Sequence, residues 1–135
     1  MKRILVGYDG SDGAEKALNR ALELIEEDGE LILLAVIPSR EEKSFVDSNA
    51  YKMVKLKANE MIKRKIEEIG EKSFDIRGIV EKGDAADKII EVANRLNCDL
   101  IILGRKGQSE IRPDVLGSVA EKVVTHAHKP VMIVR

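Results

Sequence analysis

The sequence lacks several features that define common classes of protein. A single cysteine, Cys98, excludes a framework of intrachain disulfides and is typical of a reducing compartment. No apolar run approaches the roughly 20 residues that a bilayer-spanning helix needs. The segment from Met1 to Asp9 has a strand-like pattern instead of a signal-peptide pattern. We therefore expect a cytoplasmic protein with no membrane association.

An excess of charge of one sign is also absent. The 135 residues include 23 Lys and Arg against 24 Asp and Glu, which gives a net charge of -1. A protein whose main task is to neutralise nucleic-acid phosphates needs a basic surplus, so the balance argues against a nucleic-acid partner. With 44% hydrophobic and 35% charged residues, the composition is that of one globular domain.

Short β-branched runs alternate with longer stretches of helical periodicity along the chain. This alternation is typical of an α/β fold, in which crossover helices join parallel strands. The expected strands are 3–8, 31–37, 74–80, 100–103 and 131–134. The expected helices carry apolar stripes over 14–25, 54–69, 86–96 and 119–127.

The order of these strands follows from the handedness of the connections. Because right-handed crossovers leave few arrangements, we expect one doubly wound, five-stranded parallel sheet of order 3-2-1-4-5 with helices on both faces. The winding then reverses between the first and fourth strands, and ligands bind at such reversals beyond the carboxyl ends of the strands. Two segments fall there, Asp9-Gly10-Ser11 and the loop that begins at Gly104.

The loop after the fourth strand has the residues of a phosphate site. It reads Gly104-Arg105-Lys106-Gly107, then nine residues, then Gly117-Ser118 at a helix start. Glycine lets backbone N–H groups approach an anion, and a helix N-terminus adds unpaired N–H groups and the positive dipole end. The alternative is that these glycines only form tight turns. Their spacing fits neither a Walker A loop nor the dinucleotide fingerprint.

The turn after the first strand has two interpretations. Asp9 can accept hydrogen bonds from ribose hydroxyls or amino groups of a ligand, or it can form an Asx turn or a helix cap. Ser11 or Asp12 can cap the helix that follows, and Asp12 with Glu15 has the spacing of a capping box. The residues alone leave both interpretations open.

Four features of the sequence carry a resemblance to a known family. They are the Gly-x2-Gly-x9-Gly-Ser pattern and the segments Ile4 to Ser11, Gly117 to Val123 and Pro130 to Val134. Together they resemble the universal stress protein family over essentially the whole chain. The resemblance implies a Rossmann-like domain, usually dimeric. The glycine pattern resembles that of the branch that binds ATP.

The resemblance also implies roles for individual residues. Asp9 would contact adenosine, Val36 would lie against adenine, and Gly104 to Gly107 would line the ribose-phosphate region. Gly117 to Val119 would hold phosphates. Ala120 stands where many ATP-binding relatives have Ser or Thr, so one hydroxyl contact is expected to be missing. The expected nucleotide-binding residues are Asp9, Gly10, Ser11, Val36, Gly104, Arg105, Lys106, Gly107, Gly117, Ser118 and Val119.

Three functions remain open. The leading hypothesis is a dimeric stress-response regulator that binds ATP, AMP or ADP, with or without Mg²⁺ or Mn²⁺, and whose polar segment Pro38 to Asn49 responds to the nucleotide. The second is slow ATP hydrolysis or phosphoryl transfer, for which the sequence offers no Walker lysine and no general base placed by a motif. The third is a dimeric scaffold independent of nucleotide. Each is compatible with the same fold.

The dimer is predicted from the last strand. This strand is short, apolar and placed at the edge of the expected sheet, where unpaired backbone groups invite another chain. Symmetric pairing there would use Val131, Met132, Ile133 and Val134.

Overall fold

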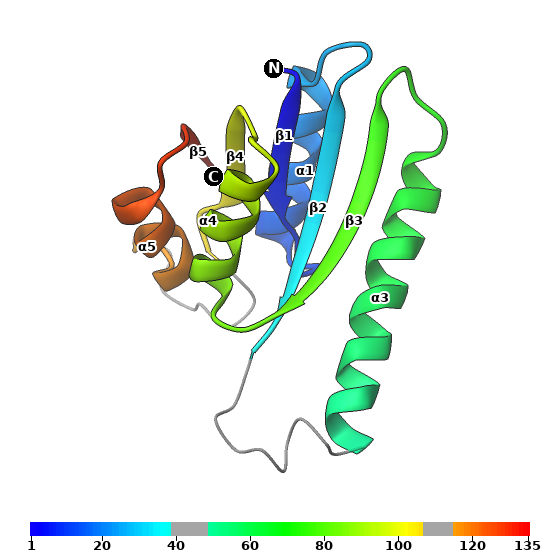
Figure 1. Ribbon diagram of the computed structural model, residues 1–135, viewed down its shortest axis with the longest axis vertical. Helices are drawn as coiled ribbons and strands as arrows, with labels where there is room; N and C mark the ends of the chain where they lie inside the picture. The colour runs from blue at the N-terminus through cyan, green and yellow to red at the C-terminus, as the bar shows by residue number, and fades with distance from the viewer. Residues whose placement is uncertain (39–48, 107–114) are drawn as a thin grey trace.

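The computed structural model describes residues 1–38, 49–106 and 115–135. These residues contain one parallel sheet with the order β3-β2-β1-β4-β5 (Figure 1), as predicted from the sequence. Its strands are β1 Arg3–Gly7, β2 Glu30–Ile37, β3 Asp75–Lys82, β4 Leu100–Gly104 and β5 Val131–Val134. The helices are α1 Asp12–Leu24, α3 Asn49–Ile69, α4 Ala85–Arg95 and α5 Ser118–His126.

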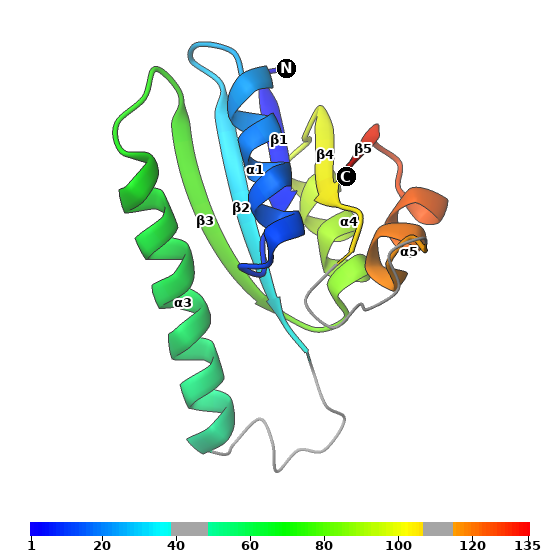
Figure 2. The same ribbon diagram turned by 180° about the vertical axis from the view of Figure 1, so that it is seen from behind.

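Helices cover both faces of the sheet (Figures 1 and 2). One buried cluster joins β1 and β2 to α1 and α3, and a second joins the opposite sheet face to α4 and α5. In β1, Ile4 and Val6 belong to the first cluster and Leu5 to the second, and all three are fully buried. Burial on both faces explains why the central strands read as continuous apolar runs.

At the start of α1, one of the two predicted caps is confirmed and the predicted capping box is not. Ser11 is the N-cap, and its hydroxyl oxygen accepts a hydrogen bond from the backbone N–H of Ala14 at 3.2 Å. Because Asp12 is already inside the helix, it cannot act as the cap of a capping box, and that prediction was wrong. The Glu15 carboxylate contacts Tyr8 and Lys65 instead.

The apolar stripe of α3 is buried only in its C-terminal part. Ile62 is buried, whereas Val54, which the periodicity placed on the inner face, is 40% exposed. The N-terminal turns of α3 extend past the carboxyl ends of β2 and β3 (Figure 1), so no sheet lies beneath them. Within the described part of the chain, no helix has the length and apolar character needed to span a membrane.

Candidate functional site

A cleft of about 420 Å³ lies at the carboxyl ends of β1 and β4, where the winding of the sheet reverses. The sequence-predicted residues that line it are Asp9, Ser11, Val36, Gly104, Arg105, Lys106, Gly117, Ser118 and Val119. Gly10 does not line the cleft, and Gly107 lies outside the described residues, as does nearly all of the segment Pro38 to Asn49. Residues from distant parts of the sequence thus meet at one place.

One wall of the cleft is apolar. Val36, near the end of β2, is half-buried, and Leu34 on the same strand face is buried and also lines the cleft. Ile89 of α4 is also buried and lines the same space. Such a wall can accept the face of an aromatic ring. The sequence interpretation did not name Leu34, and it missed Ile89 because only the fold brings α4 to the carboxyl ends of the strands.

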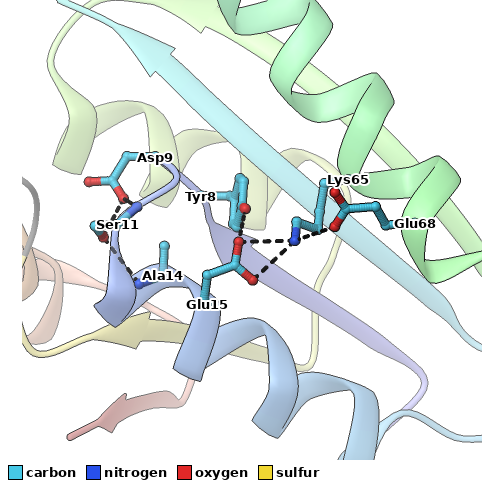
Figure 3. A network of polar contacts seen from close by, with 7 residues as sticks. All are labelled: Tyr8, Asp9, Ser11, Ala14, Glu15, Lys65 and Glu68. Atoms are coloured by element: carbon cyan, nitrogen blue, oxygen red, sulfur yellow. Dashed lines mark hydrogen bonds and ion pairs between the residues drawn. The ribbon is translucent and has the colours of Figure 1, made fainter.

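The turn between β1 and α1 forms the polar side of the cleft. Asp9 Oδ1 accepts hydrogen bonds from the Ser11 backbone N–H at 3.0 Å and from the Ser11 hydroxyl at 2.5 Å (Figure 3). Gly10 has a φ of 80°, which favours glycine, and therefore serves the turn. The Asx turn is thus formed, and Asp9 lines the cleft as well, so the two interpretations of Asp9 are compatible.

The N-terminus of α5 faces the cleft. Its N-cap, Gly117, supplies no side-chain hydrogen bond, and Ser118, Val119 and Ala120 of the first turn line the space. First-turn N–H groups have no acceptor within their own helix, and the helix dipole makes this end positive. The Gly117 N–H donates to the Arg105 carbonyl at 2.8 Å, which joins the two ends of the loop. This geometry suits an anionic group.

Gly104 has a packing role that the sequence did not indicate. A Cβ atom on Gly104 would lie 2.6 Å from the carbonyl carbon and oxygen of Gly13 in α1. A Cβ atom on Gly13 would in turn lie 2.7 Å from the Lys106 carbonyl oxygen. The two glycines therefore let the end of β4 pack directly against the first turn of α1. Glycine has a low helix propensity, so its presence in the first turn of α1 was the signal in the sequence that Gly13 has a packing role.

A cluster of polar side chains, formed by Tyr8, Glu15, Lys65 and Glu68, lies beside the β1–α1 turn (Figure 3). The Tyr8 hydroxyl donates a hydrogen bond to the Glu15 carboxylate, which also accepts from the Lys65 ammonium. Burial, and then the hydrogen bond to Glu15, raise the pKa of Tyr8 to about 12. The Lys65 pKa is also raised, mainly because its ammonium donates to Glu68. Tyr8 is therefore neutral and Lys65 charged at physiological pH.

Neither a thiol nor a metal cluster contributes to the cleft in the described residues. Cys98 is buried elsewhere, and its burial raises the thiol pKa to about 11, so it is protonated at neutral pH. No group of three or more His, Cys, Asp or Glu residues in the described ranges could hold a metal ion. The binding groups of the cleft among these residues are the N–H groups of the first turn of α5, the apolar wall at Val36 and the carboxylate of Asp9.

Comparison with known proteins agrees with this geometry. The model of the universal stress protein family matches residues 1–135. The chain belongs to this family. Universal stress protein MJ0577 of Methanocaldococcus jannaschii is 30% identical over 157 residues, which cover 99% of this chain and 94% of the relative. Universal stress protein Rv1636 of Mycobacterium tuberculosis is 30% identical over 141 residues, which cover 98% and 95%.

Solved structures of the family share the fold. The structure of MJ0577 superposes with a TM-score of 0.82 at 34% sequence identity and covers 98% of this chain and 94% of that chain. A universal stress protein in complex with cAMP has a TM-score of 0.71 at 25% identity, with 99% and 97% covered. The Rossmann-like α/β architecture expected from the sequence is thereby confirmed.

Proposed function

We propose that this universal stress protein binds an adenine nucleotide, with ATP the leading candidate, in the cleft between β1 and β4. The observation that carries the proposal is the meeting of an apolar wall at Val36 with the N-terminus of α5 in a single cleft. An apolar wall can bind the face of a nucleotide base, and a helix N-terminus can bind phosphates. The related protein in complex with cAMP supports an adenine nucleotide as the ligand.

Each part of the nucleotide has a matching group in the cleft. Adenine would lie against Val36, the ribose hydroxyls would donate to Asp9, and the phosphates would accept from the N–H groups of Ser118 and Val119. Hydrogen bonds to charged groups contribute roughly 1.5–3 kcal/mol each. A few of them approach the roughly 8 kcal/mol of micromolar binding, before the ordering costs that reduce such sums.

Positive charge next to the cleft supports the same ligand. Arg105 and Lys106 both line it, and neither makes an ion pair with another described residue. They can therefore attract phosphates without first breaking an ion pair to another described residue. Mg²⁺ or Mn²⁺ would arrive bound to the phosphates, since the described residues form no metal cluster of their own.

Equilibrium dialysis with labelled ATP and Mg²⁺ tests this function. We expect saturable binding with a Kd on the order of micromolar, which excess unlabelled ATP abolishes. Saturating ATP should also raise the melting temperature, because a ligand that binds only the native state stabilises it. If millimolar ATP neither binds nor raises the melting temperature, the nucleotide-independent scaffold is the better account.

We further propose that the protein is a cytoplasmic homodimer whose assembly responds to the nucleotide. β5 is an edge strand. The carbonyls of Pro130, which precedes β5, and of Val134 accept hydrogen bonds from the backbone N–H groups of Ile101 and Arg105. The backbone N–H and C=O groups of successive strand residues point alternately to the two sides of the strand. Because Val134 points its carbonyl towards β4, the N–H of Ile133 points away from β4, towards the open edge of the sheet. Arg105 supports the response to nucleotide because it lines the cleft and donates its N–H to Val134.

Sedimentation equilibrium tests the dimer. The native chain should sediment with twice the mass of one chain, and Ile133→Pro should sediment as a monomer. Proline removes an N–H that points away from β4 and is tolerated at such edge positions. If the native chain is monomeric with and without ATP, or if Ile133→Pro is a folded dimer, pairing through β5 is wrong.

A further inference from the structure

The polar cluster of Tyr8, Glu15, Lys65 and Glu68 connects α3 to the β1–α1 turn (Figure 3). Lys65 Nζ lies 3.1 Å from Glu15 Oε1 and 2.7 Å from Glu68 Oε2. The same nitrogen lies 5.9 Å from the centroid of the Tyr8 ring. One ammonium group of α3 thus contacts both an acidic side chain of α1 and the aromatic residue that follows β1.

The cluster shares Tyr8 with the cleft. Tyr8 precedes Asp9 and itself lines the cleft, while its hydroxyl donates to Glu15 on the other side. Glu15 is in the first turn of α1, and its backbone N–H donates to the Ser11 carbonyl at 3.0 Å. Asp9 and Ser11 line the cleft, and their neighbours Tyr8 and Glu15 make the contacts with Lys65.

Partial burial makes the ion pair between Lys65 and Glu15 stronger than an exposed ion pair. The Lys65 side chain is 19% exposed and that of Glu15 is 35% exposed, whereas pairs on open surface are screened by solvent and contribute little. Tyr8 is only 4% exposed. Loss of the ammonium would leave the Glu15 carboxylate partly buried with the Tyr8 hydroxyl as its remaining partner in the cluster, which favours a rearrangement of the turn.

We propose that Lys65 is a positioning residue for the nucleotide site, holding Glu15 and Tyr8 so that Asp9 and Ser11 keep the geometry that binds the ligand. The inference rests on the proposed nucleotide-binding function and extends it to α3, which lies outside the cleft. A turn held in its bound geometry loses less entropy on binding, so it binds more tightly. Coupling is reciprocal, so bound nucleotide should in turn stabilise the contact of α3 with the turn.

Titration calorimetry with ATP and Mg²⁺ tests the effect on affinity. Lys65→Met should weaken ATP binding on the order of ten-fold, a common size for coupling between sites. Lys65→Arg keeps the charge and should largely restore the affinity of the native chain. The matched control is Lys63→Met, an exposed lysine of the same helix that takes no part in the hydrogen bonds and ion pairs of the cluster. It should bind ATP like the native chain.

Hydrogen exchange separates positioning from a general loss of stability. Saturating ATP should slow amide exchange around Ile62 and Lys65 in the native chain, and this added protection should be absent in Lys65→Met. If Lys65→Met does not fold, Tyr8→Phe removes only the hydroxyl and should weaken binding and reduce the protection in the same direction.

The outcomes distinguish the two proposals. Failure of the native chain to bind ATP overturns the ATP-binding function on which this inference rests. If the native chain binds ATP but the folded variants show unchanged affinity and unchanged protection of α3, the function stands and the positioning role of Lys65 is wrong.

Discussion

Val36→Glu is expected to weaken ATP binding by roughly 100-fold, which corresponds to about 3 kcal/mol. Val36 lines the apolar wall where we place adenine, so a carboxylate there would be desolvated by the ligand without a partner charge. The fold should tolerate the change, because Val36 is half-buried and opens onto the cleft. Titration calorimetry with ATP measures the affinity, and circular dichroism confirms folding.

The same substitution elsewhere provides the control. Val124 is 49% exposed on α5 and does not line the cleft, so Val124→Glu should bind ATP like the native chain. Both variants add one negative charge, which separates a local effect from a change in net charge. Unchanged affinity in a folded Val36→Glu variant would show that the nucleotide does not lie against β2.

Gly104→Ala is expected to lower the free energy of unfolding by about 2 kcal/mol and to weaken ATP binding as well. The added methyl group would lie 2.6 Å from backbone atoms of Gly13, which cannot move without shifting α1. A shift of α1 also moves the turn that carries Asp9 and Ser11. Urea denaturation gives the stability change, and calorimetry gives the change in affinity.

Gly7→Ala is a matched control for this prediction. Its methyl group would meet Leu103 Cδ2 at 2.9 Å and Ile89 Cδ1 at 3.2 Å, both of them ends of flexible side chains. These can adjust more cheaply than backbone, so Gly7→Ala should cost less stability. Equal losses in the two variants, or no loss in Gly104→Ala, would contradict a close backbone contact between β4 and α1.

The strand order and the place of the cleft could be predicted because they follow from pattern and handedness. Apolar runs such as Ile4 to Val6 identify buried strands, and right-handed crossovers then restrict their order. That order predicts that Asp9 and Gly104 lie together at the carboxyl ends of the strands, and both residues line the cleft. The glycine pattern and the resemblance added Val36 and the first turn of α5.

Close tertiary contacts could not be predicted in the same way. Periodicity shows which face of a helix is apolar, but not where the sheet beneath it ends, so Val54 was assigned to the inner face and is exposed. Sequence spacing suggested a capping role for Glu15, whereas its partner Lys65 is 50 residues away. The packing of Gly104 on Gly13 depends on the exact path of two backbones.

Amide chemical-shift mapping of an ATP titration tests the central claim most directly. The binding account predicts saturable shifts at Asp9, Val36, Arg105, Ser118 and Val119, which line the cleft. Amides at the opposite end of the sheet, such as Asp75 at the start of β3, should remain unchanged. Absence of shifts at millimolar ATP, or saturable shifts confined to residues away from the cleft, would contradict the account.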